Sequence, residues 1–347
     1  MDPVSAADVS EALKRIAYRL ELDPERRHQA RAFARAARMV KDVPASELTA
    51  RSEAGTLTGL PGVGKTIAGV VAALVRGEDP GYLEKLPPVA ERAATLTTEG
   101  AAILTALKGD CHVHSDWSDG GAPIGDMAMA AIELGHEYMV LTDHSPTLTV
   151  ARGLTAERLR EQLDVVRNLN QGLAPFRILT GIEVDILADG SLDQKPDLLA
   201  ELDVVVASVH SLLRQPSVEL TPRLLLAIAN PHMDVLGHCT GRIVTGRGRP
   251  QSTFDAGAVF EACALHGVAV EINSRPERLD PPDDLLAIAR DAGCRFAIDS
   301  DAHAPGQLGW QDNGAEIAAR GGLMLQNIIN TLPADGLIEL VNSHAAS

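Results

Sequence analysis

Val204-Val-Val-Ala-Ser-Val-His210 is an almost uninterrupted apolar run that ends on a side chain able to bind a metal ion. Such runs are typical of strands in a parallel sheet that is covered on both faces. Amphipathic segments separate the runs, which predicts alternating strands and helices in a parallel α/β architecture. Four further runs have this form: Tyr138-Met-Val-Leu-Thr-Asp-His144, Ile178-Leu-Thr-Gly-Ile-Glu183, Asp234-Val-Leu-Gly-His238 and Phe296-Ala-Ile-Asp-Ser-Asp-Ala-His303.

The strand candidates together predict a distorted seven-stranded α/β barrel. In a βα barrel the carboxyl ends of the strands meet at one rim, where the active site is built. Six of the seven strands carry metal-binding side chains at that end, and the other ends with Glu271 and Asn273, where groups that support the ligands are expected. The predicted strands are 109–114, 138–143, 177–184, 204–209, 234–238, 268–272 and 295–299.

Nine side chains form the predicted metal site. A single histidine at a strand end is more often structural than a ligand, but here the pattern recurs on strand after strand. His112 and His114 are two residues apart in one predicted strand, so both should face the same side of it. Cys111, which directly precedes His112, should therefore face the other side. Mixed imidazole and carboxylate ligands suit manganese, zinc or iron, and leave the choice open. The nine are His112, His114, Asp119 (with Asp116 as an alternative in the same loop), His144, Glu183, His210, His238, Asp301 and His303.

Charge and composition limit the possible partners. Residues 1–92 hold 14 Lys and Arg against 13 Asp and Glu, whereas residues 93–347 hold 17 against 34. The barrel therefore lacks a broad basic surface, and any nucleic-acid binding must be local. The four cysteines show no CxxC spacing, which argues against a zinc finger or a disulfide framework. No run approaches the roughly 20 apolar residues of a membrane span, so we expect a cytoplasmic protein without membrane contact.

The first ninety residues have the pattern of a separate all-α domain. Apolar spacing predicts helices at 9–22 and 24–40, the second with a stripe of arginines on one face. The later segment Gly59-Leu-Pro-Gly-Val-Gly-Lys-Thr66 matches the P-loop pattern letter for letter. A P-loop follows a buried strand, however, and residues 45–55 before it are predicted to be a polar helix. We therefore expect no ATP binding.

The same glycine-rich residues resemble a helix-hairpin-helix, in which Leu60-Pro-Gly-Val-Gly64 joins two helices. Free amides at the start of the second helix can hold a nucleic-acid phosphate. A purely structural hairpin that packs two domains together is the alternative. The predicted DNA-binding residues are Gly62, Val63, Gly64, Lys65 and Thr66.

Both parts of the chain resemble parts of bacterial family-X DNA polymerases. Residues 5–90, with Arg31-Ala-Phe-Ala-Arg-Ala-Ala-Arg38 and the hairpin, resemble their amino-terminal DNA-binding domain. Residues 107–335 resemble their carboxy-terminal PHP (polymerase and histidinol phosphatase) domain. We accordingly expect a helical DNA-binding domain at 1–90, a linker at 91–106 and a PHP domain at 107–347. The motifs that carry the second resemblance are His112-Val-His114, Ser118-Asp-Gly120, Thr142-Asp-His144, Gly181-Ile-Glu-Val-Asp185, Ser208-Val-His210, Gly237-His-Cys-Thr-Gly-Arg242, Glu271-Ile-Asn273 and Asp301-Ala-His303.

The resemblance implies two or three divalent ions and no polymerase activity. In a trinuclear site of this family, His112, His114, Glu183 and Asp301 would hold the first ion, Glu183, His210 and His238 the second, and Asp119, His144 and His303 the third. The palm and fingers of the polymerases lie between the two regions. Here only about twenty residues, from Pro87 to Leu107, separate them, so nucleotidyl transfer is not expected.

The predicted reaction is hydrolysis of a phosphoester by metal-activated water. Glu183 and Asp301 are the predicted catalytic metal ligands. Arg242 and Arg152 are predicted to bind phosphate oxygens, with ordinary surface arginines as the alternative. The leading hypothesis is a phosphoesterase that acts on DNA, on single strands or 3′ ends, as a 3′–5′ exonuclease, 3′-phosphodiesterase or 3′-phosphatase. The alternatives are a small-molecule phosphatase of the histidinol-phosphate type and a noncatalytic DNA-repair accessory protein.

Overall fold

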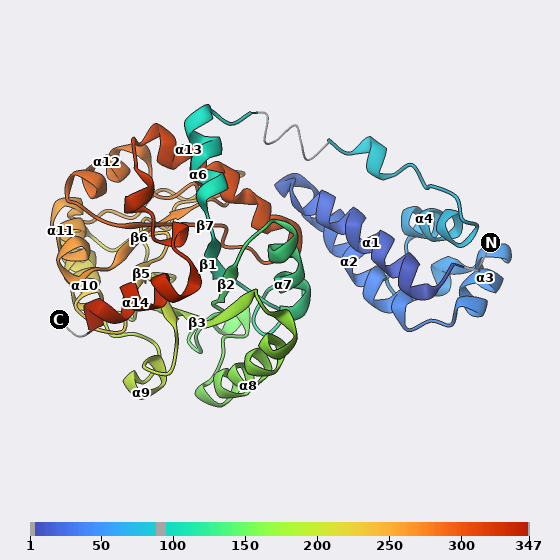
Figure 1. Ribbon diagram of the computed structural model, residues 1–347, viewed down its shortest axis with the longest axis horizontal. Coiled ribbons are helices and arrows are strands. Elements are labelled where there is room, and N and C mark those ends of the chain that lie inside the picture. The colour runs from blue at the N-terminus through green and yellow to red at the C-terminus, as the bar shows by residue number, and fades with distance from the viewer. Residues whose placement is uncertain (1–3, 88–94, 346–347) are drawn as a thin grey trace. The chain divides into compact units, whose positions relative to one another are not determined.

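The structure, a computed structural model, describes residues 4–87 and 95–345. The chain divides into two compact units, residues 1–94 and 95–347 (Figure 1). Within the described residues, no helix combines the length and the apolar character that crossing a bilayer requires.

The first unit is helical, as predicted. Residues at helical spacing on its first helix, such as Val9, Leu13 and Leu20, are fully buried, and they pack in one cluster with Phe33 of the second helix. Short 3₁₀ helices at Pro24–Arg26, Leu57–Gly59 and Leu83–Lys85 connect or follow the longer ones. The four longer helices are α1 (Ala6–Glu21), α2 (Arg27–Lys41), α3 (Ala45–Glu53) and α4 (Lys65–Val75).

The second unit confirms the predicted seven-stranded barrel. Its strands pair in the order β1 to β7, and every pairing is parallel. The helices surround the strands in Figure 1. The strands are β1 (Gly109–Val113), β2 (Tyr138–Leu141), β3 (Arg177–Asp185), β4 (Val204–Ser208), β5 (Val235–Leu236), β6 (Ala269–Asn273) and β7 (Phe296–Asp299). The helices are α6 (Thr98–Ala106), α7 (Ile124–Glu133), α8 (Ala156–Leu173), α9 (Pro196–Leu199), α10 (Ser217–Ile228), α11 (Ala256–His266), α12 (Asp283–Asp291), α13 (Gln311–Arg320) and α14 (Ala334–Ala345).

Between β1 and β7 the barrel is closed by a single backbone bridge and by side chains. Val113 and Ala302 form the bridge. Nearer the strand starts, the Cys111 amide donates to Asp299 Oδ1 at 2.8 Å. The carboxyl group thus takes the place of a missing ladder carbonyl. Burial raises the pKa of Asp299 well above its ordinary value.

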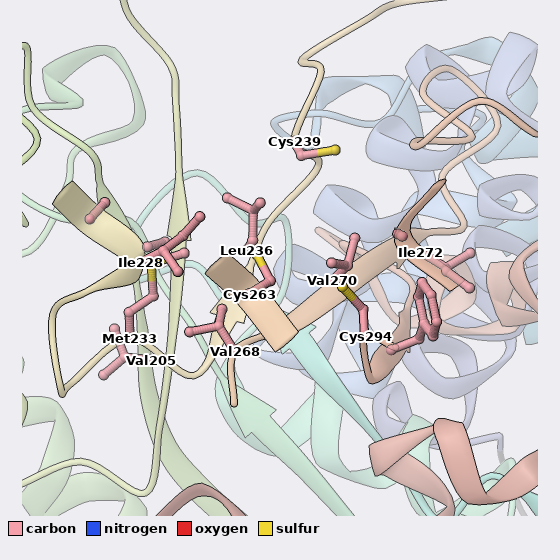
Figure 2. Close-up of a cluster of buried hydrophobic side chains, with 14 of the residues drawn as sticks. Val205, Ile228, Met233, Leu236, Cys239, Cys263, Val268, Val270, Ile272 and Cys294 are labelled. Atoms are coloured by element: carbon pink, nitrogen blue, oxygen red, sulfur yellow. The ribbon is translucent and has the colours of Figure 1, made fainter. Parts of the chain in front are cut away.

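Side chains along the strands alternate between the barrel interior and the surrounding helices. In β4, Val204 and Val206 belong to the interior cluster, whereas Val205 belongs to the cluster outside the strands. Figure 2 shows this outer cluster, in which Cys263 and Cys294 lie among apolar side chains. All four cysteines are buried and free, so they pack as small apolar groups.

The prediction that Cys111 turns away from the metal face is wrong. Cys111 joins the interior cluster with Tyr138. The pairing register of β1 and β2 shifts between Asp110 and Val113. Such an irregularity breaks the two-residue alternation, so Cys111 and the next residue, His112, both face the interior.

Part of the predicted linker is folded. Positions 91–94 lie outside the described residues, but Thr98–Ala106 forms α6, which packs against α13. Ile103 is buried in the barrel's outer cluster, and the Thr97 hydroxyl both caps α6 and donates to Glu316 Oε2 at 2.9 Å. These contacts attach α6 to the second unit.

Candidate metal centre

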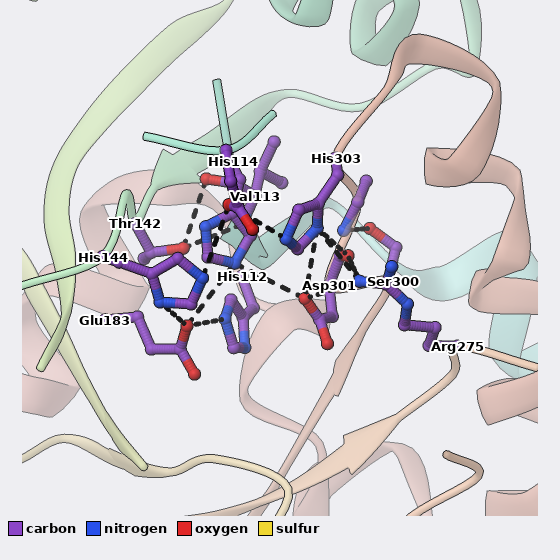
Figure 3. Close-up of polar contacts among 12 residues, drawn as sticks. His112, Val113, His114, Thr142, His144, Glu183, Arg275, Ser300, Asp301 and His303 are labelled. Atoms are coloured by element: carbon purple, nitrogen blue, oxygen red, sulfur yellow. Dashed lines mark hydrogen bonds and ion pairs between the residues drawn. The ribbon is translucent and has the colours of Figure 1, made fainter. Parts of the chain in front are cut away.

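The nine predicted ligands come together at the carboxyl ends of the strands. Because the strands are parallel and neighbouring, side chains at or just after their ends meet at one rim. Figure 3 shows how some of them lie close together: His112, His114, His144, Glu183, Asp301 and His303. His112 lies in β1 with His114 and Asp119 just beyond it, His144 follows β2, Glu183 lies in β3, His210 follows β4, His238 follows β5, and Asp301 and His303 follow β7.

Glu183 lies at the centre of the cluster. Its Oε1 is 2.9 Å from His238 Nε2 and 3.3 Å from His210 Nε2. Its Oε2 is 2.8 Å from His144 Nδ1, with the Nε2 atoms of His112 and His114 at 3.3 and 3.6 Å. One carboxylate therefore faces five imidazoles. Although burial raises the pKa of Glu183, attraction to the neighbouring His112, His144 and His210 outweighs burial and lowers it well below its ordinary value.

Two carboxylates extend the cluster towards β7. Asp301 Oδ1 lies 3.4 Å from His114 Nε2 and 3.5 Å from His303 Nδ1. Asp119 Oδ1 lies 3.3 Å from His303 Nε2 and 3.5 Å from His144 Nε2. Asp119, rather than Asp116, is thus the aspartate of its loop that reaches the histidines.

The donor atoms suit divalent cations. Three groups each gather ligand atoms within 4.8 Å of one another: His114, Asp119, His144 and His303; His112, His114 and Asp301; and His144, Glu183 and His210. Several of these buried atoms have no hydrogen-bond partner among the described residues, including Nε2 of His112 and both ring nitrogens of His114. Buried polar atoms without partners are costly, and a bound cation would satisfy them.

Glu271 and Asn273 support the ligands, as predicted from the end of β6. Glu271 Oε1 is 2.6 Å from His112 Nδ1, and its Oε2 accepts the His238 amide. Asn273 Nδ2 donates to Glu271 Oε2 at 3.2 Å and to Asp301 Oδ2 at 3.1 Å. The carboxylate fixes the His112 proton on Nδ1, which leaves Nε2 free to bind a cation.

Asp185 supports His210 and escaped the sequence analysis. Its carboxylate contacts His210 Nδ1, while His210 Nε2 faces Glu183. Burial lowers the pKa of His210, but the Glu183 and Asp185 carboxylates outweigh burial and raise it to about 9. Asp185 is two residues after Glu183 in β3, so strand alternation puts both on the same face, and that spacing was the available signal.

Cation binding should therefore release a proton from His210. In the metal-free protein, the protonated His210 stabilises the fold fully below about pH 6.5, and this stabilisation is lost as the pH rises through about 9. At pH 8 we expect release of at least about one proton per chain when ions bind, measured by titration calorimetry in buffers of different ionisation enthalpy. Asp185→Asn should reduce the release. Binding at pH 8 without proton release would contradict this assignment.

The two arginines predicted to bind phosphate contact the backbone instead. Arg242 Nε donates to the Arg278 carbonyl at 2.9 Å, and its Nη2 donates to the Leu279 carbonyl. Arg152 Nη2 donates to the carbonyls of Asp116, at 3.1 Å, and Ser118. Both guanidinium groups thus fix loops at the mouth, and their phosphate contact remains a prediction.

Two other arginines, which the sequence analysis did not select, reach the cluster. Arg275 Nη1 is 3.3 Å from Asp301 Oδ1 and 3.0 Å from His303 Nδ1, and Arg278 Nε is 3.2 Å from Asp301 Oδ2. Both belong to the loop that follows β6, at the same rim as the ligands. Their place in the loop after β6 was the only feature of the sequence that could have indicated a role at the site.

The predicted DNA-binding residues span the hairpin and the first residues of α4, and all of them except Val63 are exposed. Gly62 has φ +77°, a left-handed conformation that favours glycine. Gly64 is the N-cap residue of α4. Because glycine has no side chain, it cannot accept a hydrogen bond from the first amides of the helix. Val63 is buried in the helical core, and Lys65 is exposed. The hairpin borders a cavity of about 860 Å³, which is also lined by His28, Phe33 and Tyr82.

The P-loop-like letters occupy a setting different from that of a P-loop. Helix α3 and the 3₁₀ helix Leu57–Gly59 precede the loop. A nucleotide-binding P-loop instead follows a strand. The segment has the arrangement of a helix-hairpin-helix.

A parallel seven-stranded barrel with histidines and carboxylates gathered at its mouth defines a class of metal-binding α/β barrels. Comparison with known families gives the assignment: residues 110–275 match the PHP domain, and residues 5–79 match a helix-hairpin-helix domain. This chain belongs to the PHP family and carries an amino-terminal helix-hairpin-helix domain.

Relatives differ in how much of their length this chain covers. It is 40% identical over 248 residues to the DNA polymerase/3′-5′ exonuclease PolX of Bacillus subtilis, covering 70% of this chain but 43% of that protein. It is 30% identical over 211 residues to a probable phosphatase of Edwardsiella ictaluri, covering 58% of this chain and 80% of that protein. A crystal structure of histidinol phosphate phosphatase from Lactococcus lactis, complexed with zinc, L-histidinol and phosphate, aligns with a TM-score of 0.44 and 18% identity, covering 62% of this chain and 94% of that one.

Proposed function

We propose that this protein is a metal-dependent phosphoesterase that acts on DNA ends, as a 3′–5′ exonuclease, 3′-phosphodiesterase or 3′-phosphatase. The observation that carries the proposal is the meeting of nine imidazole and carboxylate side chains at one barrel mouth in a chain that also has a helix-hairpin-helix. Its similarity over 248 residues to a protein described as a DNA polymerase and 3′-5′ exonuclease supports DNA as the substrate.

The ligand atoms would hold two or three divalent ions, for which manganese, zinc and iron are the candidates. When bound, such ions lower the pKa of water and neutralise charge on a phosphoryl group. The three geometric groups overlap the sets that the family resemblance implies, but His114 and His144 each belong to two groups and His238 to none of the three. The proposed ligands are His112, His114, Asp119, His144, Glu183, His210, His238, Asp301 and His303.

The protein's own groups would orient the ligands and the phosphate. Glu271 and Asp185 hold the rings of His112 and His210. Arg278 is suited to bind a phosphate oxygen, because its buried Nη1 finds no hydrogen-bond partner among the described residues. Arg278 lies at the mouth, because its Nε is 3.2 Å from Asp301 Oδ2. Burial, and next the positive charge of Arg278, lower the pKa of His238.

Arg278→Lys should lower kcat/KM by about 10- to 100-fold, because lysine cannot keep the Asp301 contact and also present a second N–H to phosphate. The measurement is steady-state hydrolysis, with the metal content of each variant determined in parallel. Arg290→Lys is a matched control, since Arg290 is half-exposed on α12 and pairs with Asp291. An Arg278→Lys enzyme with unchanged kcat/KM would remove Arg278 from phosphate binding.

The hairpin would hold DNA phosphates through its backbone amides. Lys65→Glu would place a negative charge beside them, and we expect affinity for a labelled oligonucleotide to fall roughly 3- to 10-fold at low salt. Lys41→Glu is the control, because Lys41 is exposed at the end of α2 and does not line the hairpin cavity. Equal losses in both variants would show a general charge effect instead of hairpin binding.

The alternative is a small-molecule phosphatase, and the similarity to an Edwardsiella protein described as a probable phosphatase, 80% of which is covered, supports phosphatase activity without naming a substrate. A labelled single-stranded oligonucleotide and histidinol phosphate, each tested with added manganese and after chelation, separate the two functions. Release of mononucleotides or of 3′-phosphate supports the DNA proposal. Turnover of histidinol phosphate alone would replace it with the alternative, and no turnover of either by metal-loaded protein would indicate an accessory role.

A further inference from the structure

Positive charge is concentrated on three loops of an otherwise acidic unit. Residues 93–347 hold 17 Lys and Arg against 34 Asp and Glu. Residues 145–155, 209–218 and 239–254 nevertheless contain no aspartate or glutamate. Such local concentration raises the positive potential exactly where the loops lie, whatever the net charge of the unit. The loops carry Arg152, Arg214, Arg242, Arg247 and Arg249.

All three loops lie at the mouth of the candidate metal centre. They follow β2, β4 and β5, the strands after which His144, His210 and His238 occur. The loops after β4 and β5 also touch each other. Ser252 Oγ donates to the Leu213 carbonyl at 2.7 Å. We call residues 209–218 and 239–254 together the arginine lip.

Hydrogen bonds from two arginines hold the arginine lip in place. Arg223 of α10 is only 2% exposed, and its Nη1 donates to the Ser211 carbonyl at 3.0 Å and to Gln215 Oε1 at 2.9 Å. Arg249 Nε donates to the Gly241 carbonyl at 2.6 Å. Two arginines therefore fix the backbone of the arginine lip, which presents its remaining side chains in a defined arrangement.

The free side chains of the arginine lip are both cationic and apolar. Arg214 and Arg247 are exposed, and neither forms a hydrogen bond or ion pair within the described part of the chain. Leu212 and Val244 are 55% and 51% exposed. Leu212 has φ +56°, a conformation that is rare for a large side chain and that persists only where surrounding contacts impose it. Guanidinium groups bind phosphates, and apolar side chains contact sugars and base faces.

We propose that the arginine lip binds a single nucleic-acid strand through the phosphates next to the one that is hydrolysed. The inference rests on the proposed function, because it places the scissile phosphodiester at the metal ligands. Charge complementarity selects a polyanion as the occupant, since the arginine lip carries four arginines and no aspartate or glutamate within a unit of net negative charge. A substrate with one phosphate needs no contacts beyond the metal centre and would gain little from the arginine lip.

Arg214→Glu/Arg247→Glu is the test variant. We expect kcat/KM for a single-stranded oligonucleotide to fall at least about 10-fold, mainly through KM, and kcat/KM for bis(p-nitrophenyl) phosphate to stay within about twofold. The slope of log kcat/KM against log salt concentration should become shallower by roughly 0.7 for each phosphate contact that is lost. Arg177→Glu/Arg295→Glu changes the net charge equally, at residues that begin or precede β3 and β7 at the opposite end of the barrel.

The outcomes separate the two proposals. Selective loss with the oligonucleotide, absent from the control variant, supports the arginine lip. Equal loss with both substrates, unchanged oligonucleotide hydrolysis, or an equal effect of the control variant would overturn it while the proposed function stands. If the unaltered protein hydrolyses the small diester but no oligonucleotide, the proposed action on DNA fails and the arginine lip fails with it.

Discussion

Glu183→Gln should reduce phosphoester hydrolysis by about a thousandfold or more. Groups that merely orient a metal ligand contribute 10- to 100-fold, and Glu183 contacts five imidazoles directly, including His112, His144 and His238. The amide lacks the negative charge that draws cations to this point and would place an N–H among ring nitrogens. Steady-state kinetics measures the loss of hydrolysis, and metal analysis of the purified variant measures the loss of bound cations.

Glu137→Gln is the matched control for Glu183→Gln. Glu137 directly precedes β2, at the opposite end of the barrel, and its exposed carboxylate pairs with Lys108 at 2.9 Å. We expect this variant to keep full activity and metal content. If Glu183→Gln kept activity within tenfold and bound the same number of ions, Glu183 would not be a shared ligand.

Divalent ions should raise the melting temperature of the barrel unit by roughly 5–11 °C. An ion present at a hundred times its dissociation constant stabilises the fold by about 2.7 kcal/mol per site, and each kcal/mol shifts the midpoint by about 2–4 °C in a unit of this size. The structural reason is the set of buried ligand atoms that have no hydrogen-bond partner among the described residues, among them His112 Nε2 and both ring nitrogens of His114. Differential scanning calorimetry after chelation, and again with added manganese or zinc, measures the shift.

The ion dependence also has an internal control. Glu183→Gln should show a much smaller shift, because the variant lacks the central carboxylate, whereas Glu137→Gln should shift as the unaltered protein does. A melting temperature that is the same with chelator and with each added ion would show that the cluster does not bind these cations.

Much of the barrel was predictable because its strands are buried on both faces. The apolar runs at 138–143 and 204–209 became β2 and β4 with ends displaced by two residues or fewer. The run at 234–238 was less well predicted, since only Val235–Leu236 forms β5. Directly after β5, a Cβ at Gly237 would lie 2.2 Å from Ser208 Oγ of β4. This close approach of the two segments depends on how they pack, so it cannot be predicted from the sequence of β5 alone.

The sequence by itself determined the barrel, the helical amino-terminal unit and the rim at which nine side chains meet. It could do so because burial imposes a period on the chain, and parallel strands carry their last residues to one end. Beyond Glu271 and Asn273, only the tertiary structure decided which contacts support the site: Asp185 on His210, Arg278 on Asp301, and Arg242 on backbone carbonyls. Long side chains turn towards partners that are distant in sequence, so their direction depends on packing that no local pattern records.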